Sequence, residues 1–224
     1  MINYIFKMKE TTTHDLLKIE QQLSNPKGIE GIQMGEKMHE RNFSMTKASF
    51  DTLNLVNDDH VLEIGHGNCS HLEYVFSLAE NITYHGIEIS ETMYLEAKKQ
   101  QKNTNSSYFK LYDGIIIPYA SNSFDKIATI NTIYFWRKPK LFLNEISRVL
   151  RLNGTCSICF ADKSFMEKLP FVKEKFTLYN KDSFEQLILN TDLHIASIHE
   201  KKEEAISKTG DKLERKYNIV ILKK

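Results

Sequence analysis

The stretch that decides the fold is Val61-Leu62-Glu63-Ile64-Gly65-His66-Gly67-Asn68-Cys69. It begins with a short apolar run, which is typical of a buried strand, and continues into two glycines with one residue between them. Glycine has no Cβ, so a turn built on Gly65 and Gly67 lets the backbone approach a ligand closely. Apolar residues at helical spacing follow from His71 to Ala79. The stretch therefore predicts a strand, a tight turn and a helix.

The same alternation of strand and helix patterns continues along the chain. Further strands are predicted at 82–88, 108–111, 125–131 and 155–160, and helices at 91–102, 139–150 and 181–190. Ser90 is suited to cap the 91–102 helix, and Asn153-Gly154 is expected to close the 139–150 helix. Such alternating units predict an α/β fold with a mostly parallel sheet and helices on both faces.

The end of the chain breaks this alternation. Two strands are predicted at 194–199 and 216–222 with no helix between them, so we expect them to be antiparallel. The residues that follow the first of them, Lys201-Lys202-Glu203-Glu204 onward, are charged with mixed sign and are most simply interpreted as a solvated hairpin loop.

Residues 1–57 indicate a helical segment ahead of the first strand, with candidate helices at 15–23 and 44–56. Pro26, Gly28, Gly31 and Gly35 are expected to interrupt it. The segment is too short to be a domain, and we interpret it as a lid over one end of the sheet. The chain is thus divided into a helical lid, 1–57, and one globular unit, 58–224.

Composition restricts the classes of function. The 224 residues suffice for one α/β domain, and 30 Lys plus Arg against 29 Asp plus Glu give a net charge of +1. This balance lacks the basic excess expected of a protein that binds nucleic acid. No apolar run reaches the ~20 residues needed to cross a bilayer, and the first ten residues do not resemble a signal peptide. We therefore expect a cytoplasmic protein with no membrane partner.

Cysteine and histidine give no metal or disulfide pattern. Three cysteines are an odd number, and Cys156 and Cys159 lie three apart on a predicted strand, so their side chains face opposite sides of the sheet. The eight histidines show no spacing typical of metal ligands. No metal is expected.

Polar residues follow four successive predicted strands. In an open parallel sheet, ligands bind outside the carboxyl ends of the strands. Here those ends carry Glu63 with its glycine turn, Glu88, Asp113-Gly114 and Asn131. Glu88 suits a ribose diol, because its two oxygens can accept from two hydroxyls. A dinucleotide-binding turn would require another glycine at position 70, where this chain has Ser70.

These motifs together resemble the class I S-adenosylmethionine-dependent methyltransferases, specifically methyltransferase type 11. The resemblance covers about residues 58–160 and includes the fourth-strand region from Asn131 to Pro139 and the following stretch from Asn144 to Gly154. It implies a Rossmann-like sheet of seven strands with an antiparallel strand near the C-terminus. One subgroup also has a Pro-x-Gly-x-x-Gly stretch and a Met-x-x-x-Asn pair before this core, here Pro26–Gly31 and Met38 to Asn42.

The resemblance also implies roles for individual residues. Glu63 and the backbone of Gly65–Gly67 would hold the methionine part of S-adenosylmethionine, Glu88 the ribose and Asp113 the adenine amino group. Asn131 would lie near the methionine part or the transferable methyl. The full set expected to bind the cofactor is Glu63, Gly65, His66, Gly67, Asn68, Glu88, Ile89, Met93, Asp113, Gly114 and Asn131. Family members have a third glycine where this chain has Cys69, which enters positive φ only at a cost.

The expected reaction is methyl transfer by in-line displacement to a small-molecule acceptor, carried out by a monomer or homodimer. Aromatic faces attract cations, so Tyr134, Phe135 and Trp136 are the candidates to line the acceptor pocket. No residue can be named as general base, and the sequence does not specify the acceptor. Two alternatives remain: an NAD-dependent oxidoreductase on the same type of sheet, and a non-catalytic regulator that binds S-adenosylmethionine.

Overall fold

The computed structural model describes residues 12–101, 106–206 and 212–224. Seven strands of this part of the chain form one sheet in the order β3-β2-β1-β4-β5-β7-β6. The strands are β1 (His60–Ile64), β2 (Thr83–Glu88), β3 (Ser107–Leu111), β4 (Phe124–Ile130), β5 (Leu150–Ala161), β6 (His194–Ile206) and β7 (Lys212–Lys223). β7 is antiparallel to both of its neighbours, and the other pairs are parallel. The expected mostly parallel sheet with an antiparallel strand at the C-terminus is confirmed.

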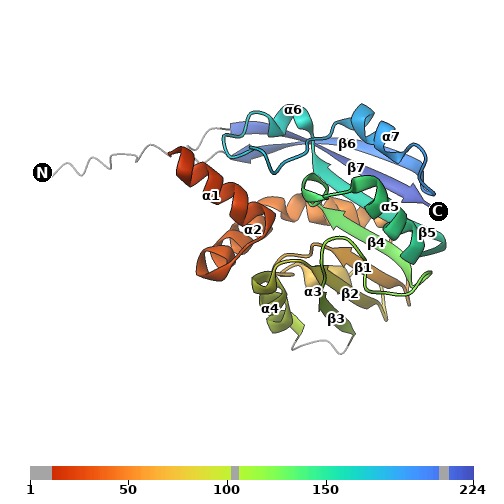
Figure 1. Cartoon of the computed structure of the whole chain (residues 1–224). Coiled ribbons are helices and arrows are strands. Elements are labelled where there is room, and N and C mark those ends of the chain that lie inside the picture. The colour runs from red at the N-terminus through yellow and green to blue at the C-terminus, as the bar shows by residue number, and fades with distance from the viewer. Residues whose placement is uncertain (1–11, 102–105, 207–211) are drawn as a thin grey trace, which may run out of the picture.

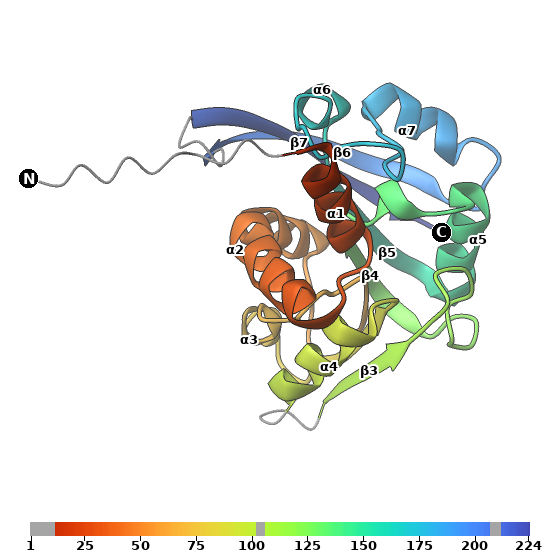
Figure 2. The same cartoon turned by 60° about the vertical axis from the view of Figure 1, so that its left-hand side comes forward.

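Helices cover both faces of this sheet, as expected (Figures 1 and 2). They are α1 (Thr13–Ser24), α2 (Gly28–Leu53), α3 (Leu72–Phe76), α4 (Glu91–Gln100), α5 (Pro139–Val149), α6 (Lys163–Met166) and α7 (Lys181–Ile188). Figure 2 shows α2 and α3 on one side and α5 and α7 on the other. Successive strand residues face opposite sides, so Val61 packs into one buried cluster and Leu62 into another. Among the described helices, none is long and apolar enough to cross a membrane.

The N-terminal segment differs from the sequence expectation. α2 is one helix of 26 residues that begins at Gly28 and passes through Gly31 and Gly35 without interruption. The two internal glycines are buried at close contacts. A Cβ on Gly31 would lie 2.7 Å from the carbonyl carbon of Pro26, and one on Gly35 would lie 2.6 Å from the sulfur of Met93. Packing against these neighbours outweighs the low helix propensity of glycine.

The C-terminal half of α2 belongs to the core of the molecule. Met45, Phe50 and Leu53 are buried, and the helix packs against β4, β5 and β7. The Ser49 hydroxyl hydrogen-bonds the Ser157 hydroxyl of β5 at 2.7 Å. α2 is therefore fixed to the sheet at one end, and its other end reaches the carboxyl ends of the strands.

Two further expectations were wrong. Asn153-Gly154 does not close α5, because the strand β5 already begins at Leu150 and these residues lie in an irregular stretch of its pairing with β4. The charged residues 201–204 are not a loop but part of β6. Two of these charges are paired across the hairpin, Lys202 with Glu214 and Glu203 with Arg215. Cross-strand ion pairs of this kind let a charged sequence remain extended.

Candidate functional site

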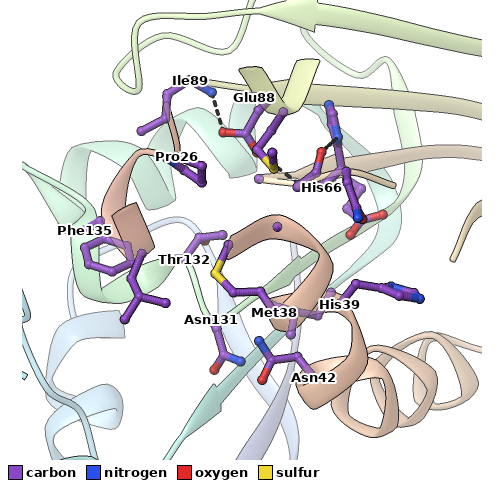
Figure 3. A pocket seen from close by; sticks show the side chains of 18 of the residues that line it. Pro26, Met38, His39, Asn42, His66, Glu88, Ile89, Asn131, Thr132 and Phe135 are labelled. Atoms are coloured by element: carbon purple, nitrogen blue, oxygen red, sulfur yellow. Dashed lines mark hydrogen bonds between the residues drawn. The ribbon is translucent and has the colours of Figure 1, made fainter. Parts of the chain in front are cut away.

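One pocket lies at the carboxyl ends of β1, β2 and β4 and is closed on one side by α1 and α2 (Figure 3). It encloses about 1020 Å³, its open mouth included. Its lining includes most of the residues expected to bind the cofactor: Glu63, Gly65, His66, Gly67, Asn68, Glu88, Ile89, Met93, Gly114 and Asn131. Residues from four separate strand ends of the sequence are thus brought together.

The turn after β1 has the backbone geometry that its glycines allow. Gly65 has φ +73° and Gly67 has φ +60°, both in the left-handed region that favours glycine. Cys69 also has a positive φ, of 56°. Its side chain is fully buried and its sulfur lies 3.3 Å from the Tyr84 hydroxyl, so packing and this contact offset part of the strain. The turn thus accommodates Cys69 at the position where the resemblance implies a third glycine.

We predict that Gly65→Ala destabilises the fold more than Gly67→Ala does. Both substitutions place alanine at left-handed φ, which costs about 1–2 kcal/mol. A Cβ on Gly65 would also lie 2.4 Å from Cγ2 of Thr132, whereas one on Gly67 meets nothing within 4 Å. Denaturant unfolding should show an extra loss of about 1 kcal/mol or more for Gly65→Ala. Equal losses of stability in the two variants would contradict the close packing of Gly65 against Thr132.

Glu88, at the end of β2, is buried and held by three backbone donors. Its Oε2 accepts from Gly67 N at 3.1 Å, and its Oε1 accepts from Ile89 N at 2.8 Å and Ser90 N at 3.0 Å. Burial raises the pKa of Glu88, and these three hydrogen bonds act in the opposite direction. A carboxylate has about four acceptor positions. The three backbone N–H groups occupy three of the acceptor positions of Glu88 and fix the orientation of the carboxylate, so the fourth position points in a defined direction.

Glu63, at the end of β1, is the centre of a buried polar network. Its Oε2 accepts from the Tyr84 hydroxyl at 2.6 Å and lies 2.7 Å from Nε2 of His71. Burial opposes the charged form, but His71 and the Tyr84 hydroxyl hold the pKa of Glu63 below its usual value. Both partners use Oε2. Among the described residues, Oε1 has no hydrogen-bond partner, and Glu63 lines the pocket.

His66 lies within the glycine turn and is also buried. Its Nδ1 lies 2.8 Å from the carbonyl oxygen of Gly67, which can only accept, so the proton of the neutral ring is on Nδ1. Nε2 is buried without a hydrogen-bond partner among the described residues. Burial lowers the pKa of His66 to about 4. The ring is therefore neutral at physiological pH.

We predict that His66 makes the protein less stable as pH falls below about 6.5. In the unfolded chain the imidazole takes up a proton near pH 6.5, while the folded protein resists protonation down to about pH 4. The unfolded state binds more protons in this range, so the free energy of unfolding decreases as the pH is lowered. Between pH 6.5 and 5.5 the wild type should lose about 1 kcal/mol more than His66→Gln. Identical pH dependence of the two proteins would show that His66 is not buried neutral.

Two of the predicted residues, Asp113 and Tyr134, do not line this pocket. Asp113 is exposed and does not line the pocket, although Tyr112 and Gly114 do. One of its oxygens accepts from the backbone of Ile115 and Ile116, and these bonds lower its pKa. Tyr134 is 3% exposed and also does not line the pocket, whereas Phe135 and Trp136 do. The Tyr134 hydroxyl lies 3.0 Å from Oδ1 of Asn131 and 3.1 Å from the carbonyl oxygen of Ala161, and either oxygen can accept its proton. The Tyr134 side chain therefore lies behind the pocket wall.

The N-terminal wall of the pocket is attached to the rest of the molecule at separate points. The Ser90 hydroxyl donates to the carbonyl of Pro26 at 2.5 Å, next to Glu88. Farther back, Oε1 of Glu20 accepts from the backbone of Lys173 and Lys175. Met38, His39, Asn42 and Thr46 of α2 line the pocket from this side.

Sequence reasoning missed several of these side chains. His71 and Tyr84 belong to no recognisable sequence motif, although a buried acid such as Glu63 requires hydrogen-bond partners. In the sequence Asn42 stands out only as half of the Met-x-x-x-Asn pair. Its contact with Arg215, 173 residues away, follows no local pattern. In the described part of the chain, no group of three or more His, Cys, Asp or Glu residues is placed to hold a metal.

Comparisons with known proteins agree with this geometry. Residues 62–158 match the family model described as a methyltransferase domain. The uncharacterized methyltransferase YdaC of Bacillus subtilis (strain 168) is 23% identical over 159 residues, which are 68% of this chain and 86% of that protein.

Solved structures share the fold. The putative methyltransferase in complex with the Trm112 methyltransferase activator of Haloferax volcanii superposes with a TM-score of 0.74 at 16% identity, covering 86% of this chain and 93% of that one. A SAM-dependent methyltransferase from Aquifex aeolicus gives a TM-score of 0.64 at 16% identity, covering 93% and 98%.

Proposed function

We propose that this class I S-adenosylmethionine-dependent methyltransferase binds its cofactor across the ends of β2, β1 and β4 and methylates a small molecule. One observation carries the proposal. The carboxylates of Glu88 and Glu63 and the glycine turn between them all line one pocket. Each carboxylate keeps an acceptor position that no donor of residues 12–101, 106–206 or 212–224 occupies.

The residues present fit the parts of S-adenosylmethionine. The unused position of Glu88 suits a ribose hydroxyl, because a neutral donor can approach a carboxylate already fixed in direction. Oε1 of Glu63 suits the ammonium of the methionine part, since the lowered pKa of Glu63 keeps the carboxylate charged. Gly67 leaves open space where a Cβ would stand. Ile89 and Gly114 would flank the adenine, with Asp113 at the outer edge.

When bound, S-adenosylmethionine would supply a methyl group on a positively charged sulfur, so that an acceptor lone pair attacking the methyl carbon in line displaces the sulfur as S-adenosylhomocysteine. The protein's own contribution is to align the cofactor and the methyl acceptor and to exclude water from the site. Phe135 and Trp136, on the wall past β4, would face the acceptor and stabilise nearby positive charge. Within the predicted lid of residues 1–57, α1 and the part of α2 that lines the pocket would cover it, because they supply one of its sides, while residues 1–11 lie outside the described part of the chain. A pocket covered in this way favours a small acceptor over nucleic acid.

Calorimetric titration tests cofactor choice. S-adenosylhomocysteine and S-adenosylmethionine should each bind once per chain, and NADH should not bind. Tight binding of NADH alone would favour the oxidoreductase alternative and contradict the proposal.

A screen of methyl acceptors tests catalysis separately from binding. The protein is incubated with S-adenosylmethionine and pooled small metabolites, and formation of S-adenosylhomocysteine is measured. We expect at least one pool to give turnover. Cofactor binding with no turnover in a broad screen would favour a non-catalytic regulator.

A further inference from the structure

Two asparagine side chains at the β4 end of the pocket are held with their carbonyl oxygens turned into the protein. Oδ1 of Asn131 accepts from the backbone N–H of Ala161 at 3.2 Å and lies 3.0 Å from the Tyr134 hydroxyl. A backbone N–H can only donate, so the orientation of the Asn131 amide is fixed. Its Nδ2 must therefore face the other way, where it contacts the sulfur of Met45 at 3.6 Å.

Asn42 of α2 is oriented in the same manner from a different element. Nη1 of Arg215, on β7, donates to Oδ1 of Asn42 at 3.1 Å. A guanidinium has no acceptor, so the amide nitrogen of Asn42 must point away from it. Arg215 is itself 9% exposed, paired with Glu203, and donates to the carbonyl of Arg41 at 2.7 Å. It is thus a rigid positioning residue for Asn42.

In the described part of the chain, neither amide nitrogen has an oxygen or nitrogen acceptor. Both asparagines line the pocket, and Figure 3 shows their nitrogen ends turned toward one another. Within the described residues, the Met45 sulfur is the one acceptor that either nitrogen contacts, and sulfur accepts only weakly. A ligand oxygen placed between the two nitrogens would satisfy both.

The place of this pair in the sheet indicates which ligand it serves. The strand order puts β2 and β1 next to each other, and β4 beyond β1. A cofactor that extends from Glu88 at β2 to Glu63 at β1 leaves the β4 side to the acceptor. Phe135 and Trp136 form part of the wall on this same side.

We propose that the methyl acceptor carries a carbonyl or carboxylate oxygen that Asn42 and Asn131 bind through their amide nitrogens. The inference rests on the proposed function, because it places the acceptor beside a cofactor bound at Glu63 and Glu88. Two amide N–H donors favour a ligand group whose oxygen accepts hydrogen bonds, and they disfavour a protonated amine at this position.

Asn42→Asp and Asn131→Asp test the proposal with little risk to the fold. Aspartate keeps the oxygen that accepts from Arg215 or from Ala161 and replaces the NH₂ group with a second acceptor. It also tolerates the left-handed φ of 57° at position 131. Asn153→Asp is the matched control, because Asn153 is exposed, has φ 67° and does not line the pocket.

The probes are phenylacetate, phenylacetamide and 2-phenylethylamine, titrated into protein saturated with S-adenosylhomocysteine. They share a ring and differ in the polar end. The wild type and Asn153→Asp should bind the acid and the amide more tightly than the amine. Each pocket variant should weaken phenylacetate at least tenfold. Asn42→Asp, at a position outside the predicted cofactor set, should leave S-adenosylhomocysteine affinity within twofold. Preference of the wild type for the amine, or unchanged phenylacetate affinity in both pocket variants, would overturn the proposal.

The cofactor's own carboxylate is the competing source of such an oxygen. If the pair held it, Asn42→Asp would weaken S-adenosylhomocysteine but not 5′-methylthioadenosine, which lacks the amino acid part, and the acceptor assignment would be wrong. These results are distinct from failure of the proposed function, which would appear as no binding of S-adenosylhomocysteine by the wild type.

Discussion

Replacing Glu88 with alanine is expected to raise the dissociation constant of S-adenosylhomocysteine by about ten- to hundred-fold. Hydrogen bonds to a charged group contribute about 1.5–3 kcal/mol, and a loss of this size corresponds to that range of affinity. The carboxylate is buried and held by three backbone donors, so it is already in place when a ribose arrives. Calorimetry of the folded variant gives the result directly. Glu73→Ala removes an exposed acid outside the pocket and should bind like the wild type.

Loss of Glu88 also frees the three backbone N–H groups, so a second comparison isolates the ribose. 5′-Methylthioadenosine and its 2′-deoxy analogue differ by one hydroxyl. The wild type should prefer the ribose form, and Glu88→Ala should distinguish the two much less. An equal preference in both proteins would remove Glu88 from the ribose site, whatever the variant does to overall affinity.

Replacing His71 with leucine is expected to destabilise the protein by about 1–3 kcal/mol, because the buried carboxylate of Glu63 loses one of its two hydrogen-bond partners. Glu63 is 3% exposed and would keep only the Tyr84 hydroxyl as a partner. The carboxylate would then be buried with one hydrogen-bond donor fewer, and burying a charged group without its partners is costly. Urea unfolding at pH 7 measures the loss.

Two further variants distinguish lost packing from the unpaired carboxylate of Glu63 as the cause of the lower stability of His71→Leu. His39→Leu changes a neighbouring ring that stacks on His71 but does not contact Glu63, and should cost about 1 kcal/mol or less. Glu63→Leu in the His71→Leu background should recover much of the stability, because it removes the unpaired charge. A similar loss in His39→Leu, or no recovery in the double variant, would show that packing rather than charge explains the effect.

The same pair predicts a response to acid. The pKa of Glu63 in the folded protein is below its usual value. Its contribution to stability is therefore complete above the pKa of an unfolded glutamate, near 4.5, and is lost as pH falls through the lowered value. The losses due to His66 begin at higher pH, so the two groups can be separated in a pH series.

The strand ends of the site were predictable from sequence because each depends on local rules. A buried strand followed by glycines places Glu63, Gly65 and Gly67 at one turn, and the parallel topology then brings Glu88 to the same edge of the sheet. Ser90 caps α4 as expected, accepting from Met93 N at 3.1 Å. These features need no knowledge of distant contacts.

The parts that could not be predicted depend on long-range packing. α2 continues through Gly31 and Gly35 because neighbours fill the space beside them, which propensity alone does not show. The charged residues 201–204 remain in a strand because their partners lie across a hairpin. Tyr134, Phe135 and Trp136 are adjacent in sequence, yet Tyr134 turns behind the wall while the other two line the pocket. The orientation of Asn42 requires Arg215 from the opposite end of the chain.

The most direct measurement is a crystal structure of the protein with S-adenosylhomocysteine. We predict a ribose hydroxyl at Glu88, the amino group at Oε1 of Glu63, and the sulfur directed toward β4 and the side of Asn131. Ligand bound elsewhere on the molecule, or bound in this pocket with its ribose away from Glu88, would contradict the proposed site.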